Sequence, residues 1–104
     1  MNQKDRDIAE EVKTAVREFD PTAEVVLFGS RARGDARSDS DYDFLVLLGL
    51  PIDSRLKEKI LNRVYLIELA TERVISPLIR AKKDWIQMEA YPIHQEISNY
   101  GIAI

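Results

Sequence analysis

Two aspartates at the start of an apolar run are the residues of this sequence best suited to chemistry. Asp41 and Asp43 alternate with a tyrosine, and hydrophobic residues follow them. If that run is a strand, its two-residue period places both carboxylates on one face, with Cα atoms about 6 to 7 Å apart. This spacing suits a divalent cation, and carboxylate oxygens select Mg²⁺ or Mn²⁺ over zinc. Because Mg²⁺ commonly completes its shell with substrate phosphates, the pair indicates a nucleotide ligand.

A Gly-Ser pair follows another apolar run and has the features of a phosphate site. Gly29 permits close backbone approach, and the Ser30 hydroxyl with nearby amides can hold a phosphate. An arginine can offset the remaining negative charge; we choose Arg33, with Arg31 and Arg37 as alternatives. Charged residues in a loop between two strands more often only keep that loop in contact with water. That alternative does not explain why Gly-Ser follows one strand and Asp-x-Asp opens the next. Two other acids are predicted to be solvated loop residues: Asp35 and Asp39.

The elements expected to position these residues alternate in type and predict an α/β (α+β) fold, with a small sheet packed against helices. Pro77 lies inside the last predicted strand, and since proline cannot donate to a ladder, we expect an edge position or a bulge there. Apolar spacing predicts helices over residues 5–19, 30–33, 53–70, 82–90 and 93–100, and strands over residues 23–28, 42–48 and 73–80. The longest helix is expected to bury a broad stripe: Leu56, Ile60, Leu61, Val64, Ile67 and Leu69.

Length and composition limit the class of protein. A chain of 104 residues with 45% hydrophobic content is expected to form one domain over residues 1–104. The net charge of −3 argues weakly against nucleic acid as a direct ligand. The absence of cysteine excludes thiolate metal sites and fits a reducing interior. Without an apolar signal segment or a membrane-length run, we expect a cytoplasmic protein with no membrane partner.

The charged segment and its flanks resemble a known signature. Gly29–Gly34 (GSRARG), followed by Ser40–Phe44 (SDYDF) and a hydrophobic strand, is similar to the signature of the DNA polymerase beta-like nucleotidyltransferase superfamily. In length the chain resembles the minimal nucleotidyltransferases, or MNT proteins, which are often antitoxins paired with HEPN-domain toxins. The resemblance implies a mixed sheet and transfer of AMP from ATP to a hydroxyl. It also implies roles for four residues: Gly29 and Ser30 in phosphate binding, and Asp41 and Asp43 in binding Mg²⁺ or Mn²⁺.

The chain departs from the family pattern at one position. The family usually carries a third carboxylate on the next core strand, but residues 73–80 contain no acid. Glu72 precedes this strand and Asp84 follows it, so either would need a shifted register. Loss of one carboxylate weakens binding of the ion that activates the nucleophile.

Three hypotheses follow. The leading one is a Mg²⁺-dependent adenylyltransferase that modifies a hydroxyl of a HEPN-type partner protein, as the antitoxin of a toxin-antitoxin pair. The alternative is a catalytically weak or inactive antitoxin that neutralises its toxin by binding. A small-molecule nucleotidyltransferase ranks last, because 104 residues leave no room for an acceptor domain. The sequence leaves open whether a second copy of the chain, as a homo-oligomer, supplies further surface.

Overall fold

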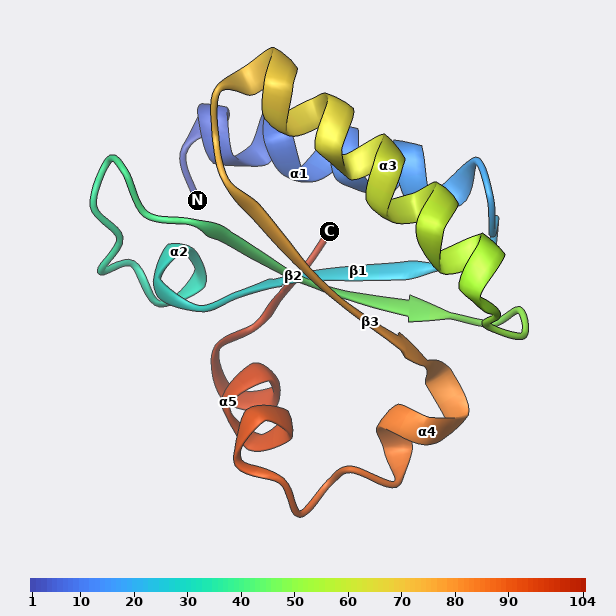
Figure 1. The fold of residues 1–104 in the computed structure, drawn as a ribbon. Coiled ribbons are helices and arrows are strands. Elements are labelled where there is room, and N and C mark those ends of the chain that lie inside the picture. The colour runs from blue at the N-terminus through green and yellow to red at the C-terminus, as the bar shows by residue number, and fades with distance from the viewer.

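A four-stranded mixed sheet is the centre of the computed structural model, which describes residues 1–104 (Figure 1). Its strand order is β3-β2-β1-β4, in which β2 and β3 are parallel and the other neighbours are antiparallel. The strands are β1 (Glu24–Phe28), β2 (Tyr42–Leu48), β3 (Ile75–Ala81) and β4 (Ile102–Ala103). The helices are α1 (Gln3–Arg17), α2 (Ser30–Arg33), α3 (Ser54–Thr71), α4 (Lys82–Ile86) and α5 (Pro92–Tyr100). The expected fold class is therefore confirmed.

Helices α1 and α3 cover one face of the sheet and enclose most of the core (Figure 1). Each begins at a side-chain cap: Asn2 accepts a hydrogen bond from the Asp5 amide at 2.8 Å, and Asp53 accepts one from the Leu56 amide at 2.7 Å. Such caps satisfy amides that have no partner within the helix. The buried residues of the two helices recur at helical spacing: Ile8, Val12, Ala15 and Val16 in α1, and Ile60, Val64 and Ile67 in α3.

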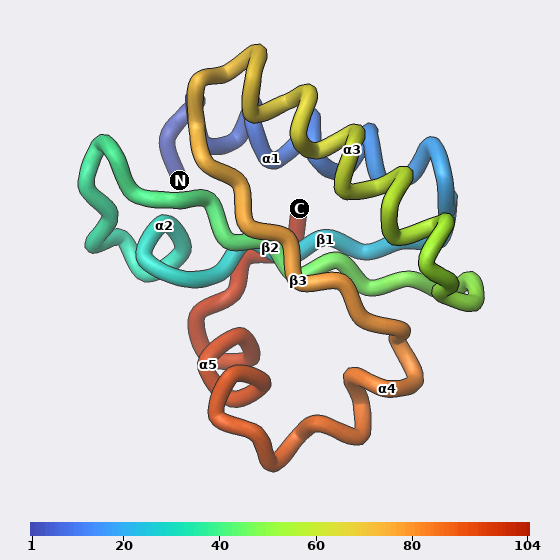
Figure 2. Tube along the Cα trace, in the orientation of Figure 1, coloured from blue at the N-terminus to red at the C-terminus, as the bar shows by residue number.

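Helices α4 and α5 lie on the opposite face of the sheet, as the trace in Figure 2 shows. A smaller buried cluster joins this face to the two helices, with Leu45 from β2, Trp85 from α4 and Ile97 from α5 among its members. Helices thus cover both faces of β2, and apolar side chains of β2 are buried on each face. None of the helices is long and apolar enough to cross a membrane.

Two expectations about the strands have different outcomes. Pro77 lies in β3, which is an edge strand of the sheet, so the expected edge position is confirmed. Strand β4 is not predicted from the sequence. Its two residues are too short to show a period, and the pairing with Val26 and Leu27 of β1 arises only in the folded chain.

The helix predictions need two corrections. The helix expected over residues 82–90 ends at Ile86, because the chain turns there before α5. The stripe expected on α3 is narrower than predicted, since Leu61 is 39% exposed and Leu69 is 59% exposed. The buried residues of α3 belong to the core cluster shared with α1 and the sheet, and neither of these two leucines belongs to it.

Candidate functional site

Asp43 lies on the face of β2 that α4 and α5 cover, and Asp41 stands just before the strand. Along β2 the side chain of Asp43 shares its face with Leu45, which belongs to the same buried cluster as Ile97 of α5. Tyr42, between the two aspartates, points to the other face and is fully buried. Asp41 is exposed and precedes the first residue of β2. The start of β2 thus directs one carboxylate toward α5 and leaves the other at the strand end.

The backbone of Gly29 lies against the carboxylate of Asp43. Phe28, the last residue of β1, pairs with Asp43, so the next residue reaches the same edge of the sheet. Gly29 has φ +74°, in the left-handed region, and a Cβ atom on it would collide with Asp43 Oδ2. Glycine is needed here because other residues rarely adopt this backbone conformation and because a side chain would have no room beside Asp43. Ser30 then opens α2, so the Gly-Ser turn and the acidic pair lie side by side.

The carboxylate of Asp43 lies in a negative environment. Partial burial raises the pKa of this carboxyl, and the charges of Asp41 and Glu96 raise it further, while Arg33 lowers it. A cation beside Asp43 would relieve this repulsion, and carboxylate oxygens are the ligands that Mg²⁺ and Mn²⁺ prefer. No three acidic or histidine side chains are grouped so that they could hold a metal ion by themselves. The two aspartates therefore fit an ion that completes its shell with substrate phosphates.

Arg33 of α2 forms an ion pair with a residue of α5. Its Nη1 donates to Glu96 Oε1 of α5 at 2.5 Å, and its Nε donates to Asp35 Oδ2 at 3.4 Å. Sequence reasoning missed Glu96, since its position relative to Asp43 depends on how α5 packs. The one signal is its three-residue spacing from Ile93, which puts the two side chains on the same side of that helix. Arg33 is thus near Asp43 with its charge matched by Glu96.

Arg31, the alternative to Arg33 for offsetting the charge of a phosphate, is engaged in other contacts. Its guanidinium donates to the carbonyl of Ser40 at 2.7 Å and to that of Ser38 at 3.2 Å, and it forms an ion pair with Asp5 at 3.4 Å. It also lies over the ring of Tyr42, with Cζ 4.2 Å from the ring centroid. Its side chain is only 8% exposed. Arg31 therefore fastens the loop before β2 to α1 and is not free to bind a phosphate.

No acid on β3 faces Asp43. The parallel register pairs Asp43 with Ser76, which is the position on β3 closest to the candidate site. Glu72 is exposed and ends α3 in a left-handed conformation with φ 56°. The acids that raise the pKa of Asp43 are Asp41 and Glu96, and neither Glu72 nor Asp84 is among them.

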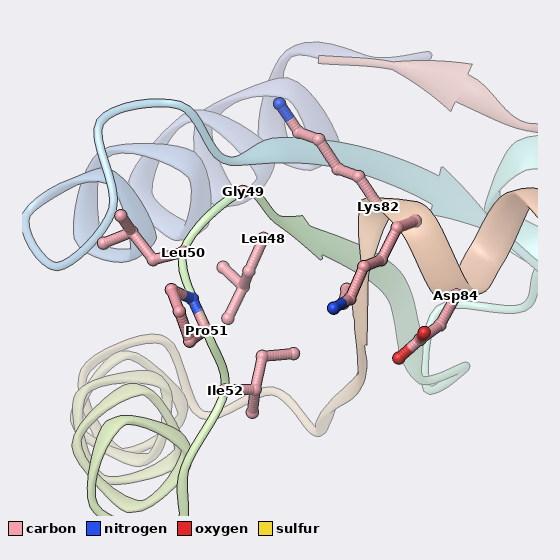
Figure 3. A pocket seen from close by; sticks show the side chains of 9 residues that line it. Leu48, Gly49, Leu50, Pro51, Ile52, Lys82 and Asp84 are labelled. Carbon is pink, nitrogen blue, oxygen red and sulfur yellow. The ribbon is translucent and has the colours of Figure 1, made fainter.

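A cavity of about 550 Å³ lies at the other end of β2 and β3, where residues 48–52 and 81–84 line it (Figure 3). Leu48 is five residues beyond Asp43, which corresponds to roughly 16 Å along a strand. Asp84 lines this cavity, so it is on the wrong end of the sheet to serve as the third carboxylate. The cavity is therefore separate from the candidate site.

A family model matches nearly the whole fold. The model of the nucleotidyltransferase domain matches residues 9–99, a range that contains the Gly-Ser pair and both aspartates. A Methanocaldococcus jannaschii protein named "Putative protein adenylyltransferase MJ0141" is 35% identical over 80 residues, which are 77% of this chain and 76% of that protein.

Solved structures share the fold. A crystal structure of a toxin-antitoxin with AMP-PNP is similar with a TM-score of 0.65 and 17% identity, over 91% of this chain and 70% of the other. A structure of the tri-AMPylated Shewanella oneidensis HEPN toxin in complex with its MNT antitoxin gives a TM-score of 0.61 and 14% identity, over 95% of this chain and 70% of that chain. At these identities the likeness concerns the fold. Because the family model spans the signature and most of the chain, the chain belongs to the nucleotidyltransferase domain family, as its signature predicted.

Proposed function

We propose that this nucleotidyltransferase transfers AMP from ATP to a hydroxyl of a HEPN-type partner protein, in a reaction that depends on Mg²⁺ or Mn²⁺. The observation that supports the proposal is the close approach of Gly29 and Asp43, which brings the Gly-Ser turn and one aspartate of the acidic pair together. The names of the similar proteins, a protein adenylyltransferase and MNT antitoxins with HEPN toxins, support the same substrate and partner.

Each residue of the site has a distinct role in this proposal. Gly29 and Ser30 receive the phosphates of ATP, and Arg33 neutralises part of their charge. Asp41 and Asp43 would hold the metal ion, which when bound lowers the pKa of the attacking hydroxyl and offsets the charge of the leaving pyrophosphate. The hydroxyl oxygen of the acceptor forms a bond to the α-phosphorus of ATP. The bond between the α-phosphorus and the oxygen that bridges it to the β-phosphate breaks at the same time. The hydroxyl proton is released, and pyrophosphate leaves.

A labelling experiment tests the function. The purified chain is incubated with ATP labelled on the α-phosphate, Mg²⁺ and the product of its neighbouring gene as the candidate HEPN-type partner. We expect label on the partner, released by mild phosphodiester cleavage as AMP, and no label when EDTA removes the metal. Asp41→Asn combined with Asp43→Asn should abolish transfer.

The matched control changes two acids outside the site. Asp7→Asn combined with Asp39→Asn removes the same amount of charge from exposed positions and should leave transfer unchanged. If wild-type protein transfers no label to any HEPN-type partner, or if the double variant at Asp41 and Asp43 still transfers it, the proposed function is wrong.

One observation favours a second candidate function. Ser76 stands where the family usually has an acid, which favours an antitoxin that neutralises its toxin by binding alone. A growth assay with the toxin distinguishes the two. Equal protection by wild type and by the Asp41→Asn, Asp43→Asn variant supports neutralisation by binding. Loss of protection by a variant that still associates with the toxin supports catalysis.

A further inference from the structure

The acid missing from β3 leaves one side of the candidate site without a carboxylate. Asp43 pairs with Ser76, and Leu78 pairs with Leu45 one period further along the same face. No residue of β3 can therefore bring a carboxylate to Asp43. A carboxylate outside β2 does act on Asp43: that of Glu96 on α5, a helix on the lower face of the sheet in Figure 1.

Helix α5 is held firmly in its place. Ile97 is 6% exposed and lies in the buried cluster with Leu45 of β2. The helix ends at Gly101, where a Cβ atom would lie 2.8 Å from Val26 Cγ1 of β1, so the chain passes too close to the sheet for any side chain. Strand β4 then pairs with β1. Glu96, next to Ile97, therefore has a fixed backbone position beside the site.

The side chain of Glu96 contacts Arg33 of α2 and lies near Asp43. It accepts a hydrogen bond from Arg33 Nη1 at 2.5 Å, and its charge is close enough to Asp43 to influence that carboxyl. The side chains of Arg33 and Glu96 are 34% and 38% exposed. Ion pairs this exposed are weak, so a triphosphate can replace Glu96 as the partner of the guanidinium.

We propose that Glu96 supplies the third carboxylate of the nucleotide site, from α5 instead of from β3. It is held by Arg33 in the free protein and turns to the side of Asp43 once the triphosphate binds Arg33. This inference rests on the proposed function, because it assumes that the Gly-Ser turn and the two aspartates bind a metal nucleotide. It gives the chain three carboxylates in a site where the sequence shows two.

Binding of Mn²⁺ tests the role of Glu96 without any transfer reaction. Electron paramagnetic resonance reports the Mn²⁺ bound to purified protein that is saturated with a non-hydrolysable ATP analogue. Glu96→Gln keeps the size of the side chain and removes its charge, and we expect it to raise the half-saturating Mn²⁺ concentration at least about tenfold. Glu89→Gln, an exposed position before α5, is the matched control and should bind Mn²⁺ like wild type.

A second variant tests whether the carboxylate itself is what matters. Ser76→Asp restores an acid at the β3 position that pairs with Asp43. Added to Glu96→Gln, it should recover most of the lost Mn²⁺ affinity. Thermal unfolding of each variant, measured without nucleotide, establishes that the protein is folded.

The outcomes separate this inference from the proposed function. If wild type and Glu96→Gln bind Mn²⁺ equally while both bind the analogue, the inference is overturned and the proposed function stands. If Glu96→Gln weakens binding of the analogue to the same extent with and without Mn²⁺, Glu96 acts only through Arg33, which also overturns it. If wild type binds no metal nucleotide, the proposed function and the inference fail together.

Discussion

The backbone of Gly29 leaves no room for a side chain beside the carboxylate of Asp43. A Cβ atom on residue 29 would collide with Asp43 Oδ2, although the two residues belong to different strand ends. The contact joins the Gly-Ser turn to the acidic pair and explains why the family signature spans both strand ends. A side chain on residue 29 would therefore displace the carboxylate of Asp43.

The first prediction concerns this contact. Gly29→Ala should reduce AMP transfer by about a hundredfold, because displacement of a reacting group by about 1 Å has an effect of that size. Gly34→Ala is the matched control, since Gly34 also has a positive φ, of +86°, but has open space around the missing Cβ. Gly34→Ala should lose about 1 to 2 kcal/mol of stability in urea unfolding, and Gly29→Ala should lose more because its Cβ atom also collides with Asp43. Equal transfer by the two variants would contradict the role given to the contact.

The second prediction concerns Arg31. Arg31→Met should lower the free energy of unfolding by about 3 kcal/mol, because it leaves the buried carboxylate of Asp5 without its cation. It should also loosen residues 34–41, since Ser38 and Ser40 lose hydrogen bonds from the guanidinium. Urea unfolding and limited proteolysis measure the two effects. Arg37→Met, at an exposed position in the same loop, should behave like wild type in both experiments.

The third prediction concerns Asp20, a buried acid whose role the sequence does not indicate. Its carboxylate accepts hydrogen bonds from the amides of Thr22, Gly49 and Leu50 and from the Thr22 hydroxyl. Burial opposes ionisation, but these hydrogen bonds outweigh it and lower the pKa of the carboxyl. Because the pKa of Asp20 is lower in the folded protein, its ionised carboxylate stabilises the fold at pH values above the unfolded pKa near 3.8. This contribution is lost as the pH falls through the folded pKa.

Urea unfolding across acidic pH checks this expectation. Asp20→Asn should lose about 2 kcal/mol at pH 7, and the difference from wild type should shrink as the pH falls below 4. The matched control, Asp39→Asn, changes an exposed carboxylate and should follow the wild-type curve at every pH. A constant difference between Asp20→Asn and wild type from neutral to acidic pH would contradict the role of the ionised carboxylate.

The fourth prediction concerns Tyr42 at alkaline pH. Burial, together with the hydrogen bond to Asp5 and the charge of Asp5, raises the pKa of Tyr42 to about 12 from 10.0. The neutral phenol therefore contributes stability that is complete below pH 10 and is lost as the pH rises toward 12. We expect a loss of roughly 2 to 3 kcal/mol over this range. Tyr42→Phe should show a smaller loss between the same two pH values, as measured by urea unfolding.

The sequence by itself determined the strands that carry the signature. Local patterns are enough for this, because a strand's two-residue period fixes which side chains share a face. The fold class followed from the order of helices and strands, and the edge position of β3 followed from Pro77. Each of these features depends on residues that are neighbours in the chain.

Only the tertiary structure decided which side chains from other elements reach those residues. Strand β4, the use of Arg31 in fastening a loop, and the exposed leucines of α3 all depend on how elements pack. The clearest case is Glu96, which meets Arg33 across 63 positions of sequence. No local period relates residues so far apart, and the distance between them is set by the packing of Ile97 and the close passage of Gly101 along β1.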